Sequence, residues 1–157
     1  MLPIVKYPNS ILKKSCSPVT FVGEEEKKLL QNMVGTMYAN HGIGLAAPQV
    51  GINKQLAVVD IGDRHLLKLI NPAVIETKGA EMMEEGCLSI PNVYVTVKRP
   101  TTVTVKSLDE KGQKVTFEAS GLLARAILHE IDHLKGRLII DYLNPLRRFF
   151  ALKKQKK

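Results

Sequence analysis

Two stretches of the 157-residue chain repeat their apolar residues every three or four positions, which is the period of an amphipathic helix. The first stretch covers residues 24–40, and Glu24–Glu26 lie in its first turn, where the helix dipole favours acidic side chains. The second covers residues 121–135, between Ser120, a suitable N-cap, and Gly136, a suitable stop. The pattern therefore predicts one helix near the N-terminus and one in the last third of the chain.

Between these helices the pattern is that of β-strands rich in Val, Ile and Thr. The expected strands are Gln55–Ile61, Leu66–Ile70, Tyr94–Lys98, Thr102–Leu108 and Lys114–Glu118. Residues 109–112, Asp-Glu-Lys-Gly, predict a hairpin turn between the last two. A short strand is expected over Arg137–Asp141, and Asn144 and Pro145 then begin a basic C-terminal helix. This order predicts an α+β fold with antiparallel sheets packed around a central helix.

The composition is that of one globular domain, with 45% apolar and 24% charged residues. No apolar run reaches the roughly 18 residues that cross a bilayer, and no apolar signal segment opens the chain, so we expect no membrane partner. The two cysteines, Cys16 and Cys87, are too few for a disulfide framework. We therefore expect a cytoplasmic protein whose cysteines are free thiols or metal ligands.

The net charge of +8 is concentrated at the C-terminus. Residues 147–157 hold six of the 23 basic residues and no acid, which leaves 17 basic against 15 acidic residues in the other 146. We therefore expect a catalytic domain over residues 1–146 and a basic tail or helix over residues 147–157. Such a tail is either a solvated end or a contact for a polyanion, most simply RNA.

Residues 129–133, His-Glu-Ile-Asp-His, form an HExxH motif inside the second predicted helix. His129 and His133 are four residues apart, so they share one helix face and can bind one metal ion. Glu130 is placed to take a proton from metal-bound water. A catalytic site of this kind needs a third protein ligand, but the two common metallopeptidase patterns fail, since residue 139 is Ile and no Glu follows Glu130.

The third ligand must then lie upstream, where the candidates are Cys87, His41, His65 and several carboxylates. Cys87 follows Gly86, which frees the backbone to bring the thiolate close, and thiolate is a strong ligand for borderline metals. His65 fits an exposed turn, and Cys16 fits a loop or small packing residue.

A glycine-rich segment, Gly-Ile-Gly-Leu-Ala-Ala-Pro-Gln, covers residues 42–49. It fits a dinucleotide-binding GxGxxA pattern only weakly, because a helix precedes it where a strand is required and Pro48 blocks helix continuation. We therefore expect no nucleotide cofactor. The segment is either a structural turn or a loop that approaches a substrate and presents the Gln49 amide.

Together the three segments resemble bacterial peptide deformylases, whose motifs are GφGφAAxQ, EGCφS and HEφDHφxG, with φ apolar. The motifs stand complete here as Gly42–Gln49, Glu85–Ser89 and His129–Gly136, and the resemblance covers nearly the whole chain. Leu128 departs from the Gln that many members have before HExxH, and His41 occupies a variable position. Neither residue belongs to a motif.

The resemblance implies a metal-dependent amide hydrolase that removes the formyl group from N-formylmethionyl nascent peptides, giving formate and a free N-terminal Met. The metal ligands that it implies are Cys87, His129 and His133. In most bacterial members the metal is iron (Fe²⁺), which Zn²⁺, Ni²⁺ or Co²⁺ can replace. Glu130 would pass the proton from water to the leaving amine, and the Gln49 side chain and the Leu88 backbone N–H resemble the oxyanion donors of the family.

The same resemblance requires an apolar slot for the methionine side chain. Leu122 and Ala126, which precede His129 on its helix, are expected to form walls of this slot. Gly42 and Gly44 would let the substrate backbone pair along the loop like an added strand.

Asp132 is expected to point away from the metal and to form a salt bridge, with Arg99 as its candidate partner. The ribosome is the expected partner of the basic tail, because the substrate leaves a surface made largely of RNA.

Two other functions fit part of the sequence. One is a general HExxH metallo-endopeptidase, which requires a downstream third ligand, and the other is an RNA-binding protein, which lacks an aromatic stacking platform.

Overall fold

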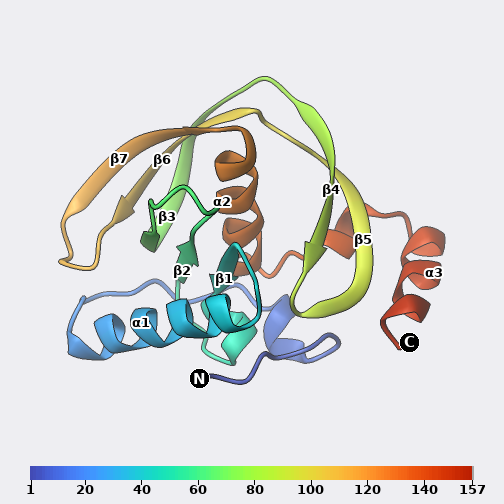
Figure 1. Ribbon diagram of the computed structural model, residues 1–157, viewed down its shortest axis with the longest axis horizontal. Helices are drawn as coiled ribbons and strands as arrows, with labels where there is room; N and C mark the ends of the chain where they lie inside the picture. Colours follow the sequence, from blue (N-terminus) through green and yellow to red (C-terminus); the bar gives the residue numbers. More distant parts are fainter. Residues whose placement is uncertain (157) are drawn as a thin grey trace.

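The computed structural model describes residues 1–156, and within them it has three α-helices, three 3₁₀ helices (η) and two antiparallel sheets (Figure 1). The elements are η1 (Ser10–Lys13), α1 (Glu24–Ala39), β1 (Gly44–Ala46), η2 (Ala47–Val50), β2 (Leu56–Val59), β3 (Leu67–Lys78), β4 (Glu81–Cys87), β5 (Ile90–Arg99), β6 (Thr102–Leu108), β7 (Lys114–Ser120), α2 (Gly121–Leu134), η3 (Ile139–Tyr142) and α3 (Pro145–Gln155). The expected α+β fold class is confirmed.

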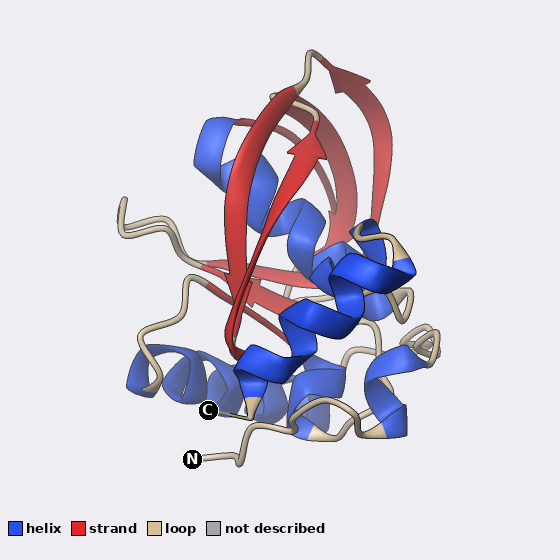
Figure 2. Cartoon of the chain, turned by 90° about the vertical axis from the view of Figure 1, so that its right-hand side faces the viewer, coloured by secondary structure: helices blue, strands red, loops and turns tan. Residues whose placement is uncertain are grey.

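The sheets curve around α2, which runs through the middle of the molecule (Figure 1). One sheet has the strand order β1-β2-β3-β6-β7, and the other consists of β4 and β5. The β3–β6 pairing shifts register between Ile70 and Ala73 and again between Val74 and Glu76. Such irregularities bend a strand, and they allow the sheet to arch over the helix. In the side view of Figure 2 the curved strands stand above the N-terminal helices, and α3 lies in front.

Helix α2 is held by apolar packing on the five-stranded sheet. The α2 residues in this cluster are Ala124, Ala126, Ile127, Ile131 and Leu134. They pack with inward-facing residues that include Val103 and Val105 of β6. A second cluster joins Met33 and Met37 of α1 to Leu45 of β1, all with no exposed surface. Each fully buried Leu, Ile, Val or Met side chain contributes about 1.5–3 kcal/mol, so both helices are firmly attached to the sheet.

One local prediction was wrong, and another was confirmed in position only. The strand expected over Arg137–Asp141 is the 3₁₀ helix η3, because the Asp141 carboxylate accepts a hydrogen bond from the Leu138 backbone N–H at 2.8 Å and stabilises the helical turn. Ser120 occupies the N-cap position of α2 as predicted, although its side chain makes no capping hydrogen bond. Its hydroxyl lies 3.1 Å from the Thr102 hydroxyl on the neighbouring strand instead.

The strand prediction also omitted part of the sheets. Strand β4 was not predicted, β5 begins at Ile90 rather than Tyr94, and β3 continues to Lys78. The β4 sequence, Glu-Met-Met-Glu-Glu-Gly-Cys, has no β-branched residue. It becomes a strand through its ladder with β5, which runs from Glu81 opposite Arg99 to Gly86 opposite Tyr94.

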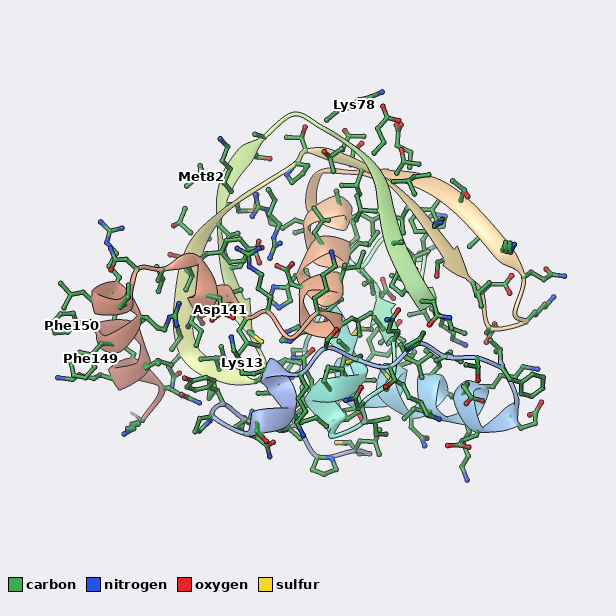
Figure 3. The ribbon with its side chains drawn as sticks, turned by 180° about the vertical axis from the view of Figure 1, so that it is seen from behind. Lys13, Lys78, Met82, Asp141, Phe149 and Phe150 are labelled. Carbon is green, nitrogen blue, oxygen red and sulfur yellow. The ribbon has the colours of Figure 1, made fainter. Side chains whose placement is uncertain are left out.

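The basic C-terminal helix α3 begins as expected, since the Asn144 side chain accepts from the Arg147 backbone N–H at 2.9 Å and Pro145 follows. Ala151 and Leu152 pack against the cluster around β5 and η3. Phe149 and Phe150 lie on the outer side and point away from the body (Figure 3). Within residues 1–156, no helix combines the length and apolarity needed to span a membrane.

Candidate metal centre

Helix α2 and the end of β4 bring one thiol and two imidazoles together. Cys87 Sγ lies 3.4 Å from His133 Nε2, and the rings of His129 and His133 are 5.0 Å apart between centroids. One ligand atom from each of the three residues falls within 4.8 Å of the others. Among the candidates for a third ligand, Cys87 is the residue that lies with the two histidines. His41 lines the adjacent cavity, and His65 is exposed.

The chemistry of this donor set fits a divalent transition metal. Thiolate and imidazole are the ligands that suit zinc, iron, nickel and cobalt, and three protein ligands leave one coordination position for a substrate or water. His129 Nδ1 is bound to Glu85, which directs Nε2 of the same ring to the cluster. Two buried polar atoms among the described residues, His133 Nδ1 and Glu130 Oε2, have no hydrogen-bond partner, as expected beside a reactive centre.

The two imidazoles differ in their electrostatics. Burial lowers the pKa of His133 well below its usual value, so the ring is neutral and suited to metal binding. Burial acts on His129 in the same direction, but hydrogen bonds with Cys87 and Glu85 outweigh it and raise the pKa of this ring well above its usual value. A metal ion bound to Nε2 would replace the proton there.

Glu85 supports the centre from the next layer of side chains. Its carboxylate accepts from His129 Nδ1 at 2.9 Å, from the Arg99 guanidinium at 2.6 and 2.9 Å, and from Arg125 at 2.7 Å. Burial alone would raise the pKa of Glu85, but the bonds from Arg99 and His129 overcome it and lower the pKa to about 2. A carboxylate that stays ionised holds the His129 ring in one tautomer and one orientation.

Asp132 forms the salt bridge with Arg99 that the sequence predicts. Its carboxylate lies 2.9 Å from the Arg99 guanidinium and accepts the Tyr142 hydroxyl at 2.6 Å. Arg99 therefore links Glu85 to Asp132, and the expected salt bridge is confirmed.

Glu130 lies beside the cluster of Cys87, His129 and His133. Only 4% of the residue is exposed, and burial raises the pKa of its carboxyl group to about 7. Gly44 of β1 lies against it, since a Cβ atom at that position would collide with the Glu130 carboxylate. The close approach explains why this position of the strand carries no side chain.

Gln49 is not an incidental loop residue. Its side-chain oxygen accepts from the Ala46 backbone N–H at 2.9 Å, so the amide nitrogen is turned to the metal centre. That nitrogen donates to Ser89 Oγ at 3.2 Å and reaches Cys87 Sγ at 3.6 Å. Leu88 follows Cys87 in the turn between β4 and β5, and its carbonyl accepts from the Lys6 ammonium at 2.8 Å.

A cavity of about 500 Å³ opens directly beside the centre. The sequence-predicted residues on its wall are Gly42, Gly44, Gln49, Cys87, Leu88, Leu122, Ala126, His129 and Glu130. His133 is buried behind them, with 1% exposed.

Cys16 belongs to the core cluster beneath α2, so its interpretation as a packing residue is confirmed.

The sequence analysis missed several residues on this wall, among them Met83, Tyr94 and Arg125. Met83 and Tyr94 face the cavity from β4 and β5, and β4 had no recognisable strand signal. Arg125 lies one turn before His129 on α2. This position could have identified it from the sequence, because a charged residue on the apolar side of a helix needs a buried partner.

Comparison with known proteins gives one consistent result. A family model described as polypeptide deformylase matches residues 1–149. The peptide deformylase of Thermodesulfovibrio yellowstonii is 48% identical over 160 residues, which cover 99% of this chain and 97% of that protein. The peptide deformylase of Clostridium botulinum is 51% identical over 138 residues, covering 88% and 93%.

Solved structures agree over the same length. The structure of a peptide deformylase from Legionella pneumophila superimposes with a TM-score of 0.95 at 40% identity, covering 99% of this chain and 94% of that one. A peptide deformylase from Synechococcus elongatus in complex with actinonin gives 0.93 at 43% identity, covering 99% and 88%. The likeness thus extends far beyond the HExxH helix.

Proposed function

Because the chain belongs to the polypeptide deformylase family, we propose that Cys87, His129 and His133 hold its metal ion and that Glu130 moves the proton in its reaction. Peptide deformylases are metal-dependent hydrolases that remove the formyl group from nascent peptides, and family membership makes this protein one of them. The observation that carries the residue roles is the meeting of one thiol and two imidazoles beside a buried glutamate. The alternative, a general HExxH endopeptidase, is not supported.

The metal ion is proposed to be Fe²⁺, with Zn²⁺, Ni²⁺ or Co²⁺ as substitutes. The thiolate and imidazole donors suit all four ions, and the family resemblance favours iron. When bound, the ion would act as a Lewis acid that polarises the formyl group and lowers the pKa of a water molecule. Elemental analysis of protein purified without oxygen identifies the native metal.

Glu130 is the proposed general base. Its carboxylate takes a proton from the attacking water as the new C–O bond forms at the formyl carbon. It then delivers that proton to the nitrogen as the C–N bond breaks, which gives formate and a free amine. Its burial supports this role, because a carboxylate with few competing hydrogen-bond partners is available to the water.

Gln49 and Leu88 are the proposed donors to the oxyanion. The Gln49 amide is fixed through its oxygen, so the nitrogen needs little reorganisation to reach a developing charge. The Leu88 backbone N–H follows directly after the proposed ligand Cys87. Each such donor typically lowers the barrier by about 3 kcal/mol.

Substrate binding is assigned to the cavity beside the centre. Leu122 and Ala126 are the proposed walls of the methionine slot, and both line the cavity from α2. Strand β1, which begins at Gly44, is the terminal strand of its sheet, and among residues 1–156 it pairs with β2 alone. Its other edge is therefore available to the substrate backbone, and Gly42 just before it keeps that approach open.

The overall proposal is tested by formate release from a formyl-Met-Ala-Ser peptide with the bound metal quantified. We expect release at a rate proportional to metal content, and no cleavage of the unformylated peptide. Internal cleavage of the unformylated peptide without formate release would point to an endopeptidase instead.

The contact between Gly44 and Glu130 gives a sharper test. A methyl group at position 44 must displace the Glu130 carboxylate, so Gly44→Ala is expected to lower kcat by roughly 10²-fold while metal content stays unchanged. Gly35→Ala is the matched control, because a Cβ there meets nothing within 4 Å. Steady-state kinetics of the two metal-loaded variants measure this difference. Equal kcat values would contradict the close contact between Gly44 and Glu130.

We further propose that α3 docks the cytoplasmic enzyme on ribosomal RNA. Ala151 and Leu152 attach the helix to the body, while Arg147, Lys153 and Lys154 are left on its outer side. This arrangement presents positive charge without contributing to the metal centre. The sixth basic residue of the tail, Lys157, lies outside the described residues, and the division of the chain at residue 146 stays a prediction.

Charge reversal tests the docking without removing the packed face of α3. Changing Lys153, Lys154 and Lys156 to Glu is expected to weaken ribosome binding at low salt at least about tenfold, with peptide hydrolysis unchanged. The matched control reverses Lys106, Lys111 and Lys114 at the opposite end of the molecule (Figure 1). Sedimentation with ribosomes measures both, and equal binding by the two triple variants would show that the tail is a solvated end.

A further inference from the structure

Arg125 makes a set of contacts that the proposed reaction does not use. It lies on α2 one turn before His129, and only 5% of it is exposed. Its guanidinium donates to Glu85 Oε2 at 2.7 Å, to the Val97 carbonyl at 2.9 Å and to the Glu81 carbonyl at 2.8 Å. One side chain therefore connects α2 to both strands of the β4–β5 sheet.

This connection matters because the proposed ligands come from two separate parts of the fold. His129 and His133 lie on α2, which packs on the five-stranded sheet, whereas Cys87 ends β4 in a sheet that shares no ladder with it. The distance between the thiol and the imidazoles depends on how β4 is held against α2. Among the described side chains, Arg125 binds β4 at Glu81 and at Glu85, two residues before Cys87.

Arg125 and Arg99 bind the same carboxylate, that of Glu85, from different elements. Arg99 comes from β5 and binds both oxygens of Glu85, while Arg125 comes from α2 and binds Oε2. The remaining contact of Glu85 is His129 Nδ1 at 2.9 Å. Removing Arg125 would leave Glu85 connected to α2 by His129 Nδ1 and, indirectly, by the Arg99–Asp132 pair, but it would remove the one direct arginine bond from α2 to this carboxylate among the described residues.

We infer that Arg125 is a positioning residue of the metal centre, which acts through Glu85 and β4 to hold Cys87 and His129 at the spacing that one metal ion requires. The inference rests on the proposed metal-binding role of the cluster. Arg125 also lines the cavity, and a long side chain of this kind can combine an apolar stem with a buried charged end.

Arg125→Met tests the anchor while keeping an unbranched apolar stem. We expect the affinity for Zn²⁺ and Co²⁺, measured by chelator competition, to fall about 10–100-fold, as when other partners of ligating histidines are lost. The Co²⁺ absorption spectrum should shift, because the ligand geometry changes. With saturating metal, KM for a formyl-Met peptide should stay within about threefold of wild type, since the wall is retained. Lys106→Met, which removes an exposed lysine from β6, is the matched control.

A double-mutant cycle shows whether Arg125 acts through Glu85. In a Glu85→Gln background, the further loss caused by Arg125→Met should shrink to less than about twofold, because the shared route is already broken. Fully additive losses would overturn this route. Thermal unfolding of the metal-free proteins establishes that each variant is folded, and if Arg125→Met is not, Arg125→Lys takes its place, since one ammonium cannot serve three acceptors.

The outcomes separate this inference from the proposed function. Wild-type affinity and an unchanged Co²⁺ spectrum in the folded Arg125 variant would overturn the inference, whatever the activity of the wild type. Absence of formate release by the metal-loaded wild type would overturn the proposed function and leave the affinity measurement intact.

Discussion

Replacing Glu130 by Gln is expected to lower kcat for formate release by roughly 10²–10⁴-fold without loss of metal or fold. The substitution keeps the size of a side chain that is 4% exposed and lies against Gly44. It removes the only property that the proposed mechanism requires of this residue, which is the capacity to accept a proton and pass it on. Glu130→Ala should give a loss of the same order.

Metal content and unfolding temperature distinguish this result from a structural defect. The proposed ligands Cys87, His129 and His133 remain in both variants, so elemental analysis should give the wild-type stoichiometry. Glu118→Gln, on the exposed face of β7, removes an acid far from the centre and should retain full turnover. Near wild-type turnover in metal-loaded Glu130→Ala would contradict the assignment of Glu130 as the general base.

The HExxH helix could be predicted from the sequence because its information is local. A spacing of four residues puts His129 and His133 on one face of any α-helix, and the apolar period of residues 121–135 shows which face is buried. The N-terminal helix followed from the same period. In both cases the structure agrees with the expected bounds to within one residue.

The third ligand could not be obtained in this way. Residue chemistry left Cys87, His41, His65 and several carboxylates open, and the family resemblance favoured Cys87. Which candidate lies beside the two histidines depends on how β4 packs against α2. That packing is a tertiary contact made by buried ionic groups such as Glu85 and Arg125. Strand β4 itself gave no period-two signal, because its strand conformation comes from pairing with β5.

The error over residues 137–141 has a similar origin. Leu138, Ile139 and Ile140 have the composition of a strand, and all three are buried. The Asp141 carboxylate, however, binds the Leu138 backbone N–H and also pairs with Lys13 of η1 (Figure 3). A side chain that satisfies a backbone donor locally favours a helical turn over a strand, and the apolar pattern does not report this competition.

Changing Cys87 to Ser is expected to abolish tight metal binding, while Cys16→Ser should leave it intact. Serine keeps the shape of Cys87 but replaces a thiolate by a hydroxyl, a poor ligand at neutral pH. The loss should exceed the roughly 10–100-fold that follows removal of an outer hydrogen-bond partner, because a direct ligand disappears. Elemental analysis after dialysis, together with chelator competition, measures it.

Cys16 is the matched control because the same substitution falls on a thiol with different surroundings. It lies in the core cluster beneath α2, and burial raises the pKa of its thiol to about 11, so it stays protonated at neutral pH. Its conversion to serine places a hydroxyl among apolar side chains and should lower stability by about 1–3 kcal/mol, with the metal retained. Equal metal content in Cys87→Ser and wild type would contradict the ligand assignment, because the two remaining histidines of α2 would then suffice to hold the ion.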